Sequence, residues 1–194
     1  MGSITDDRGY NQMFTPSIAM KIRMERRCDY ILKQMSNITE QTHILEIGSG
    51  TGEMAASLAL KTKAQVTGSD ICAPFMDEAK QKHIASNLNF IILDFNHTES
   101  IQNKQFDYIV GNGILHHLYN NLDSALINIK RLLKPNGQII FLEPNLYNPY
   151  CFLIFNTTKR IRNWAKLEPD EMALRKNKIK KQLKHAKYSN IKIK

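Results

Sequence analysis

The 194-residue sequence has only three cysteines, no long apolar run and no repeat or low-complexity segment. Cys28, Cys72 and Cys151 lie far apart without metal-ligand spacing, which argues against a disulfide framework and indicates a reducing compartment. The longest uncharged apolar cluster, 150–155, is too short to cross a bilayer, and no secretory signal is recognisable. With 42% apolar residues the chain can bury a full core. We therefore expect a cytoplasmic protein with a single domain, 1–194.

Acidic residues are scarce near the C-terminal end. Residues 159–194 hold 13 Lys and Arg against three Asp and Glu, so this segment alone accounts for the net charge of +9. Apolar and aromatic residues at 149–155 precede it. That combination is typical of an element at an anionic membrane surface, although the same charge could attract RNA. A solvated helix with lysines opposite an apolar stripe is the simplest alternative.

An apolar strand pattern at 44–47 runs into three alternating glycines, Gly48, Gly50 and Gly52, and a helical pattern follows at 53–60. Alternating glycines let the chain turn sharply where side chains would be strained, which favours a ligand cradle, although a purely structural turn is the alternative. A dinucleotide-binding loop needs its third glycine where Glu53 stands, and this carboxylate would repel phosphates. A nicotinamide-dependent dehydrogenase is therefore the least favoured reading.

Strand and helix patterns alternate along the rest of the chain. Further strands are predicted at 65–71, 88–95, 106–112 and 137–143, with helices at 74–85 and 122–133. This order predicts an α/β protein with a doubly wound, mostly parallel sheet. Ligands of such sheets lie beyond the carboxyl ends of the strands. Asp70 and Asp94 each close a predicted strand there, although either one could merely cap a helix.

The Gly-x-Gly-x-Gly spacing with an acidic residue two before it resembles motif I of the class I S-adenosylmethionine-dependent methyltransferases, of the small-molecule, type 11-like group. The resemblance extends over 43–145 and includes Lys134-Pro135-Asn136-Gly137 before the fifth strand. It implies a Rossmann-like fold and S-adenosyl-L-methionine as cofactor. It also implies a set of cofactor-binding residues: Glu46 near the ammonium group, Gly48, Ser49, Gly50 and Gly52 along the methionyl part, Asp70 on the ribose, Ile71, Met76, Asp94 and Phe95 around the adenine, and Asn112 after the fourth strand.

Two adjacent histidines follow the fourth strand in Ile114-Leu115-His116-His117. The resemblance matches His117 to a recurring family histidine, so we predict His117 as a general base for acceptors that must lose a proton. A histidine that only hydrogen-bonds the loop is the alternative. Metal-dependent relatives place acids where Gly113 and His116 stand, so we expect no metal.

The outer segments are predicted from the same resemblance. Residues 1–40 would form an N-terminal helix and lid, with Tyr10, Asn11, Phe14 and Arg23 as lid candidates; 41–145 would bind the cofactor, and 146–194 would be an acceptor-side insertion and basic C-terminal segment. Asn145, Tyr147 and Tyr150 are candidate acceptor contacts. Residues 188–194 read as a sixth strand, and a seventh strand is missing, which predicts a truncated sheet.

The sequence thus predicts a methyltransferase that acts on an oxygen or nitrogen of a small or lipid-like acceptor. An RNA methyltransferase is the weaker alternative, because no separate RNA-binding module is recognisable. The motif of Asn or Asp, two prolines and an aromatic residue, which marks enzymes that methylate DNA amino groups, is absent. A non-catalytic partner subunit with the same fold is the third hypothesis. Neither the acceptor nor the oligomeric state follows from the sequence.

Overall fold

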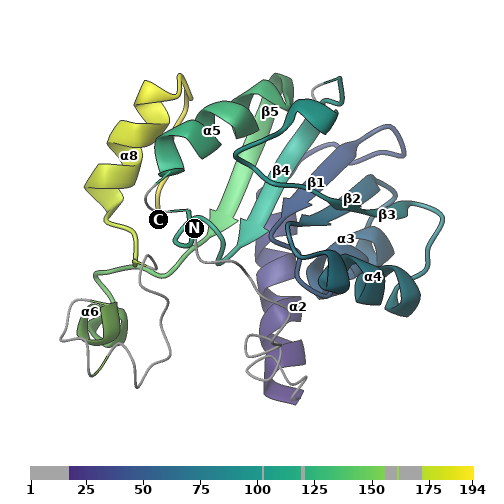
Figure 1. The fold of residues 1–194 in the computed structure, drawn as a ribbon, viewed down its shortest axis with the longest axis horizontal. Helices are drawn as coiled ribbons and strands as arrows, with labels where there is room; N and C mark the ends of the chain where they lie inside the picture. Colours follow the sequence, from purple (N-terminus) through teal and green to yellow (C-terminus); the bar gives the residue numbers. More distant parts are fainter. Residues whose placement is uncertain (1–17, 102, 119–120, 156–160, 162–171) are drawn as a thin grey trace. The chain divides into compact units, whose positions relative to one another are not determined.

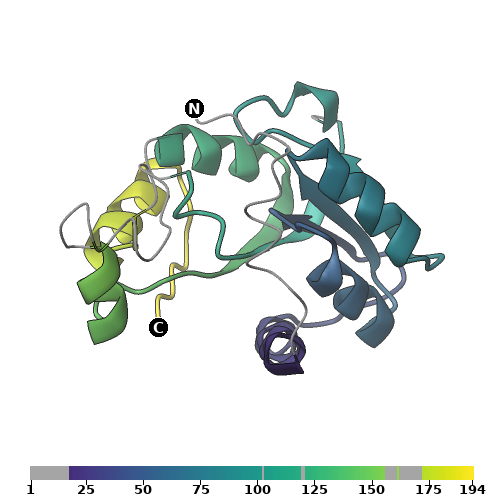
Figure 2. The same cartoon turned by 60° about the horizontal axis from the view of Figure 1, so that its bottom comes forward.

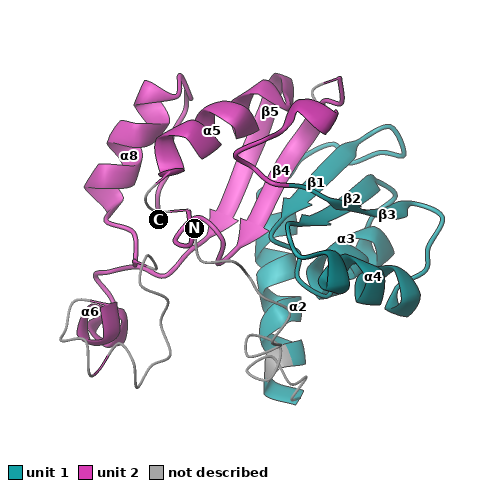
Figure 3. Cartoon of the chain, in the orientation of Figure 1, with its two compact units in different colours: residues 1–93 teal, residues 94–194 magenta. Residues whose placement is uncertain are grey.

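The computed structural model describes residues 18–101, 103–118, 121–155, 161 and 172–194. The chain forms two compact units, 1–93 and 94–194, which are coloured separately in Figure 3. The expectation of a single domain stays a prediction. The first unit contains the glycine loop, and the second contains the adjacent histidines.

Unit 1 is a layer of parallel strands with helices packed against it (Figure 1). Its elements are α2 (Ile18–Leu32), β1 (His43–Ile47), α3 (Glu53–Lys61), β2 (Gln65–Asp70), α4 (Ala73–Lys82) and β3 (Leu88–Ile92). β2 lies between β1 and β3 and is parallel to both. Four of the five residues of β1 are buried, as expected for a strand that is covered on both faces. The three strands and the helices between them occur in the predicted alternating order.

Unit 2 contains one pair of parallel strands and the C-terminal helices. Its elements are η1 (Glu99–Ile101), β4 (Phe106–Asn112), α5 (Leu122–Arg131), β5 (Leu133–Leu142), α6 (Pro149–Phe155) and α8 (Lys176–His185). β4 pairs with β5. Leu122, Leu126 and Ile129 of α5 recur at helical spacing and are buried. α8 lies beside α5 in both views (Figures 1 and 2), and the Tyr188 hydroxyl donates to the Leu126 carbonyl at 3.0 Å.

β5 begins earlier than the sequence pattern suggested. The Pro135-Asn136-Gly137 segment lies inside the strand as an irregularity, because Phe106 pairs with Leu133 while Tyr108 pairs with Gln138. Asn136 takes up the distortion with a φ of 64°. An added Cβ at Gly137 would lie 3.0 Å from the carbonyls of Lys134 and Phe106, so the bulge also requires a residue without a side chain there.

The prediction of a sixth strand at 188–194 was wrong. Residues 191–194 have no regular secondary structure. Lys187 and Asn190 have φ values of 61° and 52°, which interrupt an extended backbone. The apolar side chains that suggested a strand therefore belong to an irregular segment after α8, and the described residues contain five strands.

Candidate functional site

The glycine loop after β1 has a backbone that only glycine adopts easily. Gly48, Gly50 and Gly52 have φ values of 65°, 52° and 85°. A Cβ at Gly52 would lie 2.7 Å from the Phe90 ring, whereas a Cβ at Gly50 would meet nothing within 4 Å. Gly52 therefore serves close packing inside unit 1. Gly50 instead leaves space open above the loop.

Asp70 at the end of β2 holds this loop in place. Its Oδ2 accepts a hydrogen bond from the Gly50 amide at 2.9 Å, and its Oδ1 accepts one from the Cys72 amide at 3.0 Å. The carboxylate is partly exposed. Because each carboxylate oxygen has two lone pairs, both oxygens keep an acceptor position beyond these bonds. Asp70 thus presents two adjacent charged acceptors, which suit two neighbouring hydroxyl groups.

Two side-chain oxygen atoms near the loop are buried without a hydrogen-bond partner. The Glu46 Oε2 atom and the Ser49 hydroxyl have no hydrogen bond among the described residues, and the two residues are 3% and 8% exposed. Burial raises the pKa of Glu46 to about 8, a backbone hydrogen bond from Ala55 partly opposes this, and the charges of Glu53 and Asp70 add to it. Unpaired buried oxygens are costly, so a ligand with donor groups at this place would be stabilised.

The residues predicted to surround an adenine differ in accessibility. Ile71, directly after β2, is 47% exposed, whereas Met76 in α4 is fully buried. A ring could reach Ile71 at once but would reach Met76 only if neighbouring side chains moved. The Leu93 amide donates to the Asp70 carbonyl at 2.9 Å, and Asp94 is the next residue of the chain.

Unit 2 begins with Asp94 and Phe95. The Asp94 Oδ1 atom accepts bonds from the Asn96 backbone and side-chain amides at 2.8 and 2.9 Å, which is the geometry of an Asx turn. The Phe95 ring is buried, and the Asn128 side chain of α5 donates to its carbonyl at 2.8 Å. This loop is therefore fixed by its own hydrogen bonds. The adenine contacts of both residues stay predictions.

Glu143, the residue directly after β5, organises the loop that leaves β4. Its Oε1 accepts hydrogen bonds from the Ile114 and Leu115 amides at 3.0 and 2.8 Å. Its Oε2 accepts one from the His116 amide at 3.3 Å and contacts His116 Nδ1 at 2.9 Å. Gly113, which has a φ of 69°, lets the chain turn into this arrangement. One carboxylate thus binds three consecutive amides and an imidazole.

The histidine paired with a carboxylate is His116. The role of His117 as a general base stays a prediction. The side chains of His116 and Glu143 are 8% and 10% exposed, so the pair is well shielded. The His117 ring lies 4.2 Å from the His116 ring, between centroids, and is half-buried. The sequence reasoning missed Glu143, although its place one residue beyond a strand at the carboxyl edge was a usable signal. Asn112 ends β4, as predicted.

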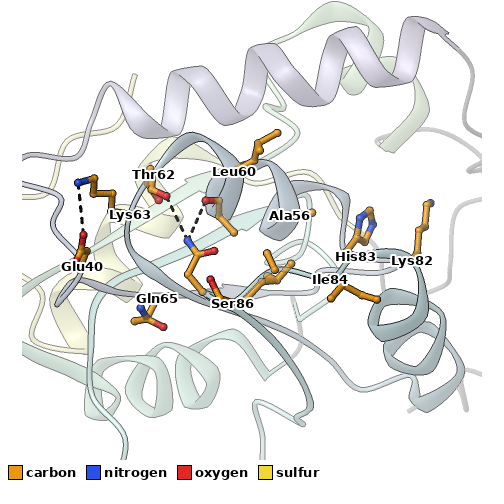
Figure 4. A pocket seen from close by; sticks show the side chains of 14 residues that line it. Glu40, Ala56, Leu60, Thr62, Lys63, Gln65, Lys82, His83, Ile84 and Ser86 are labelled. Carbon is orange, nitrogen blue, oxygen red and sulfur yellow. Dashed lines mark hydrogen bonds and ion pairs between the residues drawn. The ribbon is translucent and has the colours of Figure 1, made fainter.

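A groove of about 670 Å³ in unit 1 does not belong to this group of residues (Figure 4). It is lined by the C-terminal end of α3 and by Gln65 and Leu88, which begin β2 and β3. The Asn87 side chain donates to the carbonyls of Ala59 and Ala64 at 3.0 and 2.9 Å there. The groove therefore lies at the amino ends of the strands, away from the edge where such sheets bind ligands.

Some predicted features are not described by the structure. Tyr10, Asn11 and Phe14 lie outside the described residues, whereas Arg23 is exposed on α2. Across 18–101, 103–118, 121–155 and 172–194, no three His, Cys, Asp or Glu side chains are grouped so that they could hold a metal ion. No helix in these ranges is long and apolar enough to cross a membrane. The cytoplasmic location stays a prediction.

Residues 45–141 match the family model described as "Methyltransferase domain", which is half of the chain and includes the glycine loop, Asp70 and His116. The chain belongs to the methyltransferase domain family. It is a class I methyltransferase domain with S-adenosylmethionine as cofactor, as the glycine loop indicated. The predicted doubly wound, Rossmann-like fold is confirmed by the structural comparisons.

Two solved structures and one curated relative illustrate the likeness. An S-adenosylmethionine-dependent methyltransferase from Archaeoglobus fulgidus matches with a TM-score of 0.71 at 18% identity, over 94% of this chain and 74% of that chain. The phosphoethanolamine N-methyltransferase 2 of Haemonchus contortus, solved with S-adenosylmethionine, matches with a TM-score of 0.69 at 19% identity, over 86% and 37%. A hybrid polyketide and nonribosomal peptide synthetase of Trichoderma harzianum is 32% identical over 61% of this chain. The chain spans only 3% of that relative's length.

The unpartnered atoms of unit 1 fit this cofactor. Asp70 offers two acceptors to the two ribose hydroxyls, Gly50 leaves its Cβ position open, and Glu46 Oε2 lacks the donor that an ammonium group would supply. A nearby cation would also favour the charged form of Glu46. The individual assignments stay predictions for all of these residues: Glu46, Gly48, Ser49, Gly50, Gly52, Asp70, Ile71, Met76 and Asn112.

Replacing Gly50 by alanine should mainly weaken cofactor binding, whereas replacing Gly52 by alanine should mainly lower stability. Gly50→Ala costs about 1 kcal/mol of stability from its positive φ alone, but its methyl group enters the open space and should weaken cofactor binding. Gly52→Ala carries the same strain and also the clash with Phe90, so we expect a loss of roughly 3 kcal/mol. Urea denaturation and calorimetric titration measure both quantities. Equal stability of the two variants would contradict the assigned packing.

Glu46 should make stability depend on pH. Because the pKa of Glu46 is raised to about 8 in the folded protein, the folded state holds a proton that the unfolded state releases from about pH 4.5 upward. Stability is therefore lost as pH rises between these values, by at most about 5 kcal/mol. Glu46→Gln should flatten this slope in urea denaturation at pH 5.5 and 8.5. An unchanged slope would show that Glu46 titrates normally.

Proposed function

We propose that this chain transfers a methyl group from S-adenosylmethionine to an oxygen or nitrogen of a small or lipid-like acceptor that gives up a proton. The observation that carries this proposal is the shielded contact of 2.9 Å between His116 Nδ1 and Glu143 Oε2 in the loop after β4. In the family this loop borders the cofactor. A carboxylate that accepts from Nδ1 fixes the tautomer and leaves Nε2 as the basic nitrogen.

The cofactor would be held by the residues of unit 1. Asp70 would accept hydrogen bonds from both ribose hydroxyls. The backbone from Gly48 to Gly50 would lie along the methionyl part of the cofactor, and Glu46 would face its ammonium group. When bound, S-adenosylmethionine supplies a methyl group on a positively charged sulfur, which is a good leaving group. The protein's main task is then to hold the acceptor in line with that methyl group.

His116 would supply the proton transfer. As the acceptor oxygen or nitrogen attacks the methyl group, His116 Nε2 takes up the acceptor's proton, and Glu143 stabilises the imidazolium that forms. The new bond joins the acceptor atom to the methyl carbon, and the bond from that carbon to sulfur breaks. Glu143 also keeps the loop amides in place, so it acts as a positioning residue. The competing version of this proposal assigns the base to His117, as the sequence predicts.

A second acceptor class is an activated C–H group. Two curated relatives that match this chain are a hybrid polyketide and nonribosomal peptide synthetase and a highly reducing polyketide synthase, of which the chain spans 3% and 6%. A methylene group between two carbonyl groups is acidic enough for an imidazole base to remove its proton. The same His116 and Glu143 pair would serve this reaction without any change of role. The acceptor is then an acyl chain that a neighbouring part of a longer protein could carry.

Methyl transfer from radiolabelled cofactor to a panel of acceptors tests the proposal. The panel contains aliphatic alcohols and acids, phosphorylated amines, a β-ketoacyl thioester and an unstructured RNA. Label on a small acceptor, with a rate that rises as pH passes the imidazole range, supports the proposed function. Label on RNA alone would favour the RNA methyltransferase. Cofactor binding without transfer to any acceptor would favour the non-catalytic partner subunit.

A further inference from the structure

The surface of α8 is strongly basic. Residues 172–194 contain nine Lys and Arg and no Asp or Glu, and all nine basic side chains are exposed. Ile179 and Leu183 point to the interior, and α8 packs against α5. The helix is therefore anchored by its apolar side, while Lys180, Lys181 and Lys184 face solvent. Within residues 172–194 no acidic residue offsets their charge.

Helix α6 in the same unit exposes apolar side chains. Phe152 and Leu153 are 52% and 55% exposed, and Tyr150 is 63% exposed. The opposite side of the helix is buried, because Ile154 and Phe155 pack with Leu146 and Ala173. α6 is therefore held firmly while its other side chains meet water. Three large apolar side chains exposed on one short helix are costly unless something covers them.

The two helices are joined within unit 2. Leu146, just before α6, donates its amide to the Leu174 carbonyl at 3.3 Å, and the Leu174 amide donates to the Pro144 carbonyl at 3.1 Å. Leu174 lies two residues before α8 begins. Ala173, beside it, packs on the buried side of α6. Figures 1 and 2 accordingly show α6 and α8 at the same end of this unit.

We propose that α6 and α8 together form a docking surface for an anionic lipid bilayer. The lysines of α8 would approach the negative headgroups, and Phe152, Leu153 and Tyr150 of α6 would enter the boundary between headgroups and acyl chains. The exposed aliphatic Leu153 favours a bilayer over RNA, because nucleic acid offers nothing apolar to an aliphatic side chain. A merely solvated basic helix would not need the apolar face of α6. The bilayer would place the protein next to lipid-like acceptors.

Vesicle sedimentation with the full chain tests this surface. The protein should sediment with vesicles of phosphatidylcholine containing about 30% phosphatidylserine but not with phosphatidylcholine alone, and binding should fall steeply between about 0.05 and 0.5 M salt. Replacing Lys180, Lys181 and Lys184 by glutamine should lower the partition coefficient about 100-fold, since each lysine near such lipids is worth roughly a factor of five. The matched control replaces the exposed Lys21, Lys33 and Lys80 of unit 1 and should change binding far less.

The apolar contribution is tested separately. Phe152→Ser with Leu153→Ser should weaken vesicle binding about tenfold and leave its salt dependence unchanged. The control is Leu60→Ser with Ile84→Ser, because these side chains are 87% and 89% exposed in unit 1. Cofactor titration shows that each variant is folded. The proposal would be overturned if the test and control variants lost vesicle binding equally. It would also be overturned if the protein bound a single-stranded RNA but not the anionic vesicles.

Discussion

Replacing Asp70 by alanine should remove measurable binding of S-adenosylmethionine. The Asp70 carboxylate offers one charged acceptor to each ribose hydroxyl, and a hydrogen bond to a charged group is worth about 1.5–3 kcal/mol. Loss of two such bonds predicts an affinity lowered by roughly 100-fold to 10,000-fold. The Gly50 and Cys72 amides also lose their acceptor, so the loop itself should loosen. Calorimetric titration of the variant measures the affinity.

Two controls separate binding from folding. Asp70→Asn keeps the shape and one carbonyl acceptor, so its affinity should lie between those of the native protein and Asp70→Ala. Asp29→Asn removes a carboxylate of the same unit that is ion-paired with Lys61, and it should bind normally. Thermal unfolding reports whether each variant is folded. Native affinity in a folded Asp70→Ala protein would refute the ribose assignment.

Replacing His116 by glutamine should lower kcat by about 100-fold to 10,000-fold with the acceptor found in the label screen. The expected loss follows from removal of the basic nitrogen, while the cofactor site in unit 1 is untouched. His117→Gln provides the matched test, because it changes the same residue type one position along the chain. We expect a much smaller effect there, since the carboxylate pairs with His116. The reverse ranking would restore His117 as the base.

The Glu143→Gln variant tests whether Glu143 positions His116 for proton transfer or only holds the loop after β4 in place. The glutamine carbonyl can still accept from the Ile114 and Leu115 amides, but its amide group cannot accept from His116. We therefore expect a lower kcat and little change in the KM for the cofactor. The pH profile should be displaced to lower pH, because loss of the paired negative charge destabilises the imidazolium. A Glu143→Gln protein with native kcat and pH profile would limit this residue to loop structure.

The sequence predicted the fold well because its signals are local. The apolar run of β1, the alternating glycines and the spaced strands each follow from backbone conformation and burial of neighbouring residues. The early start of β5 was not predictable in this way. Pro135 and Gly137 normally end elements, and only pairing with β4 shows that they form a bulge within the strand. The wrong prediction of a sixth strand at 188–194 has a similar origin, because the apolar pattern does not indicate the positive φ values of Lys187 and Asn190.

Site residues were predictable from the sequence where a single residue lies at a fixed position of a motif. They were less predictable where two residues far apart in the sequence form a pair. Asp70 followed from its place at the end of a strand, and its bond to Gly50 agrees with that reasoning. The pair of His116 and Glu143 joins residues 27 positions apart, so the spacing alone favoured neither histidine. Burial likewise distinguishes two residues that were both predicted to contact the adenine, because Ile71 is exposed whereas Met76 is buried.

Calorimetric titration of the purified chain with S-adenosylmethionine, S-adenosylhomocysteine and NAD tests the central claim most directly. The open Gly50 position, the two free acceptor places on Asp70 and the unpaired Glu46 oxygen together predict saturable binding of both sulfur compounds and none of NAD. At pH 7 the ammonium group should also displace the proton that the raised pKa of Glu46 retains, so the measured heat should depend on the buffer. A folded protein that ignores both sulfur compounds, or binds NAD instead, would contradict the account.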